Sequence, residues 1–159
     1  MNSAASLRTL IEYNYALYAR VWDSIATLSD EQFVADIDYS HGSIRNQIVH
    51  VATVDARWWR GLKEQPGART FNLNPVDYPT RESARALWDA TETEVKAYVT
   101  SLNDEDVGRV PQGMGGPVWQ VLTHLVNHGT DHRAQILRAL HDYGAPTFDQ
   151  DLVLYLWSP

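Results

Sequence analysis

Apolar residues recur every third or fourth position in four long stretches of the chain, which is the spacing of a helix with one buried face. The predicted helices cover residues 7–28, 43–62, 80–102 and 117–143, and no stretch shows a convincing strand pattern. Four amphipathic helices without strands predict an all-α fold, specifically a four-helix bundle formed by a single domain over residues 1–159.

Local signals mark where several helices begin. Ser29 and Gln32 have the spacing of a capping box, which predicts a short helix through Ala35. Ser43 is a typical N-cap for the second long helix, and Pro117 suits the first turn of the fourth. Another short helix is expected within residues 147–157.

The connections at residues 63–79 and 103–116 are longer than tightly linked antiparallel helices need. They leave room for a crossover between helices.

Three histidines recur at every fourth position of the last long helix: His124, His128 and His132. Side chains four residues apart lie one turn above another, so two such imidazoles can bind one metal ion from one side. Each four-residue step also drifts about 40° around the helix. On this projection His132 falls within the apolar stripe, His128 near its edge and His124 further out, so His128 and His132 are the better buried pair.

This spacing alone is a weak metal signal, because histidines four apart are also common on solvated helix faces. The metalloprotease motif H-E-x-x-H is excluded, since Gly129 stands where its glutamate would be. A metal site therefore needs a further ligand. His50 is the best placed, on the flank of the apolar stripe of the second long helix, whereas His41 in a loop and His141 on a polar face are expected to be solvated.

Three neutral imidazoles that leave one position open are typical of a catalytic metal site. A ligand set made only of nitrogen suits zinc or nickel, and the sequence does not choose between them.

Two polar residues interrupt apolar stripes. Asn14 in the first helix is expected either to make a core hydrogen bond between helices or to face the site. Asp55 in the second long helix is expected to be a buried partner for a cation or a histidine, or to mark a place where the helix opens.

Composition narrows the class of protein. A net charge of −7 argues against a nucleic-acid surface, and no apolar run approaches the length needed to span a membrane. The N-terminus lacks a secretory signal pattern, so a cytoplasmic location is expected. The chain has no cysteine, which removes disulfides, thiolate ligands and a cysteine nucleophile.

Nearly the whole chain resembles the DinB/YfiT-like family of metalloenzymes. The resemblance rests on three features in the right order. These are Ser43-Ile44-Arg45 leading to His50 and then Trp58-Trp59, the run His128-Gly-Thr-Asp-His132-Arg-Ala-Gln135-Ile136, and the segment from Asp151 to Tyr155. Family members often have glycine where this chain has Ala134.

The resemblance implies a four-helix bundle, often a homodimer, with a divalent metal held by His50, His128 and His132. It also implies a metal-dependent thiol S-transferase, in which a low-molecular-weight thiol attacks a small electrophilic substrate. Two alternatives stay open. One is a metal-dependent hydrolase, for which Asp55 and Asp131 are the only carboxylates expected near the ligands. The other is a metal-binding or stress-response protein without catalysis.

A metal-bound imidazole usually donates its second N–H to an acceptor that fixes the ring. The candidates for this orienting role are Gln135, Asp131, Asn14 and His124. Gln135 projects near His128 and is the better oriented, whereas Asp131 is as readily a solvated helix charge.

Overall fold

The computed structural model describes residues 3–157 and contains only helices within that range. The elements, in chain order, are α1 (Ala4–Ile25), α2 (Asp30–Val34), α3 (Ile44–Leu62), η1 (Ala68–Thr70), η2 (Pro75–Asp77), α4 (Arg81–Ser101), α5 (Asp104–Val107), α6 (Val118–Asp142) and α7 (Leu152–Trp157). The predicted all-α fold is confirmed.

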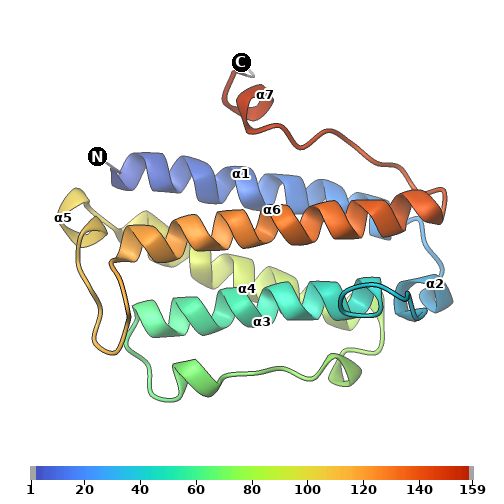
Figure 1. Cartoon of the computed structure of the whole chain (residues 1–159), viewed down its shortest axis with the longest axis horizontal. Coiled ribbons are helices and arrows are strands. Elements are labelled where there is room, and N and C mark those ends of the chain that lie inside the picture. The colour runs from blue at the N-terminus through green and yellow to red at the C-terminus, as the bar shows by residue number, and fades with distance from the viewer. Residues whose placement is uncertain (1–2, 158–159) are drawn as a thin grey trace.

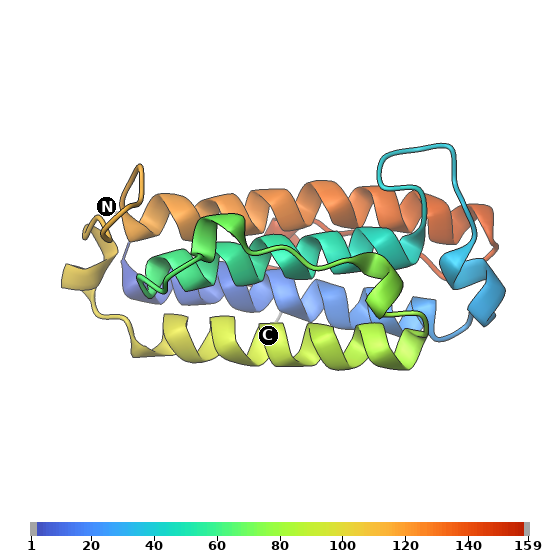
Figure 2. The same cartoon turned by 90° about the horizontal axis from the view of Figure 1, so that it is seen from below.

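The four long helices form a bundle in which α1 and α3 occupy opposite corners. Each of them packs against both α4 and α6. Figures 1 and 2 show that α1 and α6 run in one direction, and that α3 and α4 run in the other. The connection over residues 63–80, which carries the short helices η1 and η2, returns along the length of α3 and is the expected crossover.

The local capping signals were good predictors of helix boundaries. Ser29 and Gln32 form both hydrogen bonds of a capping box, and the Ser43 hydroxyl accepts from the backbone N–H of Asn46. Two details differ from the sequence prediction. Pro117 is the N-cap of α6 rather than part of its first turn, and the connection after α4 contains the short helix α5, capped by Asn103. Neither difference moves a predicted site histidine.

Large aromatic side chains fill the centre of the bundle. Trp88 from α4, Phe33 from α2 and the α1 residues Tyr15 and Tyr18 are at most 2% exposed. These rings remove much apolar surface from water, which stabilises the bundle.

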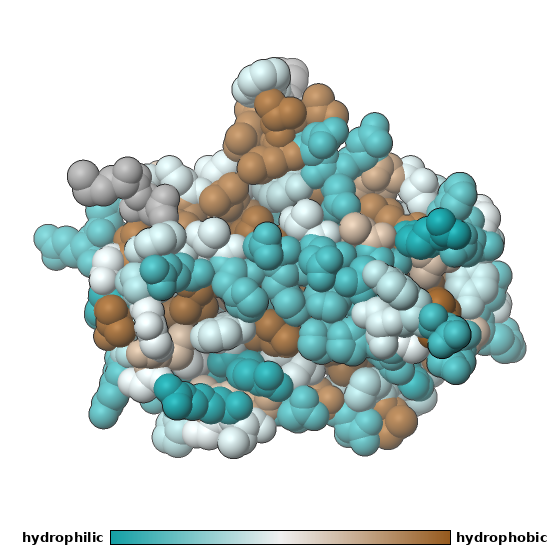
Figure 3. Space-filling model, in the orientation of Figure 1, coloured by the Kyte–Doolittle hydropathy of each residue, from teal (hydrophilic) through white to brown (hydrophobic). Residues whose placement is uncertain are grey.

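The C-terminal segment lies outside the bundle. Only Leu152–Trp157 of the expected 147–157 helix is helical, and this short α7 protrudes beside α1, with the ring of Tyr155 5.5 Å from that of Tyr13 (Figure 1). Figure 3 shows apolar side chains gathered on this protrusion, above a largely hydrophilic face. Among the described residues, no helix combines the length and apolar character needed to cross a membrane.

Candidate metal centre

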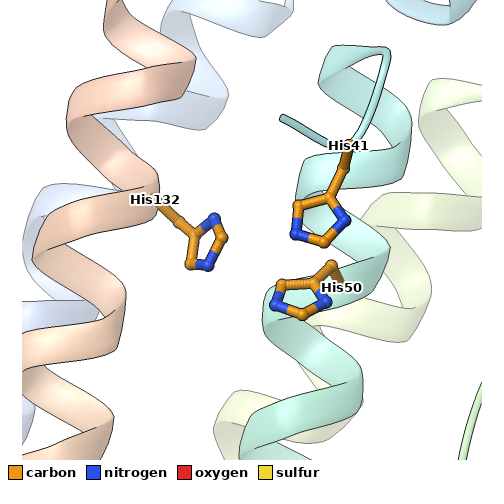
Figure 4. A group of neighbouring side chains, drawn as sticks. All are labelled: His41, His50 and His132. Carbon is orange, nitrogen blue, oxygen red and sulfur yellow. The ribbon is translucent and has the colours of Figure 1, made fainter. Parts of the chain in front are cut away.

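Helices α3 and α6 run antiparallel against one another and bring together histidines that are far apart in the sequence. Figure 4 shows His132 on α6 pointing toward His50 on α3, while His41 reaches over His50 from the loop before α3. Ligand nitrogens of His41, His50 and His132 all lie within 4.8 Å of one another.

His128 joins this cluster through His50. The Nε2 atoms of His50 and His128 are 3.2 Å apart, and the ring centroids of His128 and His132 are 4.3 Å apart. Two nitrogens bound to one tetrahedral zinc at their usual bond length would be about 3.3–3.4 Å apart. The spacing of His50 and His128 therefore suits a shared divalent ion.

Burial keeps these imidazoles neutral at neutral pH. It lowers the pKa of His50 to about 4 and that of His128 to about 3, and the neighbouring histidines act in the same direction. The pKa of His132, which is only 6% exposed, is also lowered, first by burial. Neutral imidazoles keep a lone pair on one nitrogen, which is the form that binds a metal.

A chain of side-chain amides fixes the ring of His132. Its Nδ1 lies 2.7 Å from Oε1 of Gln47, and Nε2 of Gln47 donates to Oε1 of Gln135 at 2.8 Å. Nε2 of Gln135 then donates to a carboxylate oxygen of Asp131 at 3.1 Å. Since an amide oxygen only accepts hydrogen bonds, His132 carries its proton on Nδ1 and leaves Nε2 free as a ligand.

Gln47 is a residue of the candidate site that the sequence prediction did not include. Gln135 and Asp131 belong to the network, but Gln47 alone bonds directly to a site histidine. Gln47 lies three residues before His50 and therefore near it on α3, which was the available signal. The signal was incomplete because pairing with His132 depends on how α3 and α6 pack.

His124 lies at the margin of the cluster. It is exposed, its ring centroid is 5.6 Å from that of His128, and its other neighbour is the edge of Trp58. It does not hydrogen-bond to a site histidine in the described structure, and Nδ1 of His128 is buried there without a hydrogen-bond partner. His141 is exposed, as expected.

His41 lies closer to the site than the sequence suggested. Its side chain is exposed, as expected of a loop histidine, yet its ring stacks on that of His50 with 3.9 Å between centroids. The sequence predicted the loop but not its path, because that path depends on the tertiary contacts of the segment between α2 and α3.

Asn14 and Asp55 belong to the bundle interior. Asn14 accepts hydrogen bonds from Arg133, which is the core role considered for it. Asp55 is 1% exposed and accepts a hydrogen bond from the Tyr15 hydroxyl at 2.8 Å. Burial raises the pKa of Asp55 to about 7. In the described structure neither residue hydrogen-bonds to a site histidine.

The fold and the site define a helical-bundle protein with a histidine-only candidate metal centre. The model of the DinB family matches residues 1–159, and the chain belongs to that family. The crystal structure of a DinB-like protein from Bacillus cereus is similar, with a TM-score of 0.67, 20% sequence identity, and coverage of 92% of this chain and 97% of that one. A comparison with curated proteins finds no match.

Proposed function

We propose that this protein binds a divalent metal through His50, His128 and His132 and acts as a metal-dependent thiol S-transferase on a small electrophile. The observation that carries the proposal is the convergence of neutral imidazoles from α3 and α6, with Gln47 holding the Nε2 lone pair of His132 free. The nitrogen-only donor set suits zinc or nickel.

The chemistry of such a centre explains the proposed reaction. A bound divalent ion lowers the pKa of a thiol, so that thiolate is available at neutral pH. The chain has no cysteine, so the thiol has to be a separate small molecule. The sulfur attacks the electrophilic carbon, the leaving group departs with the bonding electron pair, and the thiol proton passes to water.

A cavity further along α3 offers space for the electrophile. It measures about 310 Å³ and lies between the end of α3, η1 and the loop before α6, with Trp58 and Met114 among its lining residues. Two observations connect it to the histidines. Trp58 packs edge-on against His124, and the positive charge of Arg57, another lining residue, contributes to the lowered pKa of His50. An apolar electrophile bound there would contact Trp58, whose ring packs against His124 at the margin of the histidine cluster.

Hydrolysis is less well supported by the geometry. It would need a general base that can reach a water at the open position. Asp55 is buried beside Tyr15, and Asp131 is exposed and accepts from Gln135. Because Asp55 is buried in the bundle interior and Asp131 is bonded to Gln135, thiol transfer is the better proposal.

The test mixes the zinc- or nickel-loaded protein with a panel of low-molecular-weight thiols and a chloro-nitroarene. Metal-dependent loss of thiol with release of chloride is the expected result. His132→Ala should abolish it, whereas the matched control His141→Ala, an exposed histidine on the same helix, should not. Metal-dependent ester cleavage without thiol would favour the hydrolase, and turnover of neither substrate would leave a binding protein.

The ligand set is tested separately by measuring metal content. His50→Ala, His128→Ala and His132→Ala should each lose most of the bound metal, and His141→Ala should retain it. Full metal retention in His50→Ala would contradict the assigned ligands.

A further inference from the structure

We propose that His41 is a fourth, exchangeable nitrogen ligand of this centre, carried by the loop before α3. The inference rests on the proposed metal site and extends it. The three histidines on α3 and α6 are fixed by helical backbone, whereas His41 belongs to the 35–43 connection and is exposed to solvent. It is thus the one member of the cluster that can leave without moving a helix.

The placement of the His41 ring supports a role as a ligand. Its centroid lies 3.9 Å from that of His50 and 5.4 Å from that of His132, so it lies close to histidines of both α3 and α6 (Figure 4). A ligand nitrogen of His41 lies within 4.8 Å of ligand nitrogens on both of these residues. A side chain on an exposed loop is able to point into solvent, but that of His41 faces two proposed ligands.

The backbone of the loop is folded to hold His41 in this position. Gly42 has a φ of +84° and donates its N–H to the carbonyl of Tyr39 at 3.1 Å. The side chain of Asn46, in the first turn of α3, donates to the carbonyl of His41 at 2.8 Å. The Asn46 hydrogen bond therefore joins the loop to the start of α3, where Ser43 caps the helix.

A fourth histidine changes what the site does. With three imidazoles, one tetrahedral position is open to a substrate thiol. With His41 in place that position is filled, so the thiol has to compete with an imidazole. The expected signature has two opposite parts: removing His41 weakens the binding of the metal and strengthens the binding of the thiol to the metal-loaded protein.

The alternative role for His41 is to stack on His50 and shield it from water. His41→Phe separates the two roles, because phenylalanine keeps a flat ring of similar size but offers no nitrogen. If His41 is a ligand, His41→Phe behaves as His41→Ala toward the metal. If it only stacks, His41→Phe behaves as the wild type.

The experiment is a competition titration of Zn²⁺ against a chromophoric chelator for the wild type, His41→Ala, His41→Phe and the control His141→Ala. Loss of a direct ligand should cost at least as much affinity as loss of a residue that orients one, which is about 10–100-fold. The visible absorption of the Co²⁺-loaded proteins reports the ligand change independently, and a helical far-ultraviolet signal confirms that each variant is folded.

Weaker Zn²⁺ binding and an altered Co²⁺ spectrum in both His41 variants, with tighter glutathione binding in His41→Ala, would support the proposal. Wild-type affinity and spectrum in His41→Phe would overturn it, whatever His41→Ala shows. These outcomes are separate from failure of the proposed function, which would appear as a wild-type protein that binds no divalent metal at all.

Discussion

Two neighbouring residues of α6, His132 and Arg133, face two different polar environments. His132 points toward α3, where the nitrogens of several histidines converge. Arg133 is 0% exposed and bonds to Asn14 of α1. Both are charged or ionisable residues in a helical core, so burial alone does not distinguish a site from a structural interaction.

The difference lies in how the nitrogens are satisfied. Each guanidinium nitrogen of Arg133 donates to an oxygen, the acceptors being Gln150 at 3.1 Å, Thr130 at 3.0 Å and the Asn14 carbonyl at 3.3 Å. The rings of Tyr13 and Tyr18 lie against it as well. At the histidine cluster, by contrast, ring nitrogens face one another, with Nε2 of His50 3.2 Å from Nε2 of His128. Donors that are all paired with oxygens indicate a structural role, and imidazole nitrogens that converge on one another indicate a place for a cation.

The largest expected effect on stability comes from replacing Arg133, the buried cation. Arg133→Met should lower the free energy of unfolding by about 3 kcal/mol, because it leaves buried oxygens without donors at a cost of about 1–3 kcal/mol each. Urea unfolding of the metal-free protein measures this. His132→Ala is the matched comparison: it should lose metal but keep most of the stability. If Arg133→Met instead lost metal and kept its stability, the division between the two regions would be wrong.

The second prediction concerns Asp55, a buried carboxyl group in the same part of the bundle interior as Arg133. The pKa of Asp55 rises from an ordinary 3.8 to about 7 in the folded protein, first because of burial. Between these values the folded state holds a proton that the unfolded state has lost, so this residue makes stability fall as pH rises from about 4 to about 7. Asp55→Asn removes that dependence and keeps an acceptor for Tyr15.

The free-energy advantage of Asp55→Asn over the wild type should therefore grow by up to about 1.4 kcal/mol per pH unit across this range and level off above it. Urea unfolding at several pH values, with chelator present, gives this difference directly. A difference that stays constant with pH would show that Asp55 ionises normally in the folded protein.

A third prediction concerns the glycine that lets α1 approach α6. A Cβ built on Gly129 would collide with Oδ1 of Asn14, and the carbonyl of Gly129 accepts from the Tyr18 hydroxyl. Gly129→Ala should therefore destabilise the protein by about 1–3 kcal/mol through overpacking. Gly108→Ala is the control, since Gly108 has helical backbone angles and no atom within 4 Å of its Cβ position. Equal thermal stability of the two variants would contradict the close approach.

The sequence predicted what depends on local pattern. The capping residues Ser29 and Ser43 were identified from short-range spacing, and the structure confirms both caps. The helical projection also ranked the three α6 histidines correctly by burial, with His132 buried, His128 half-buried and His124 exposed. This ranking succeeds because the angle between side chains on one helix is fixed by its geometry.

The remaining features depend on contacts between elements. Gln47 reaches His132 only because α3 and α6 pack in one particular register, and no spacing within either helix encodes that register. The same holds for His41, whose loop had to fold back onto α3. Arg133 follows a predicted ligand directly, and its burial becomes apparent only when Asn14 is found across the helix interface.

The smallest effects should come from the amide chain behind His132, and they should decline along it. Gln47→Ala removes the acceptor of Nδ1 and should weaken Zn²⁺ binding about 10-fold or more, because the imidazole loses its fixed orientation. Gln135→Ala leaves Gln47 in place without its own partner, so its effect should be smaller, and the exposed Asp131 should matter least.

Competition titration against a chromophoric chelator measures all three, with Gln120→Ala, an exposed glutamine of α6, as the control. Urea unfolding of the metal-free variants separates a loss of orientation from a loss of folding, since Gln47 is buried. If Gln135→Ala weakened binding more than Gln47→Ala, Gln135 would have to act on a ligand directly, as its projection beside His128 suggested.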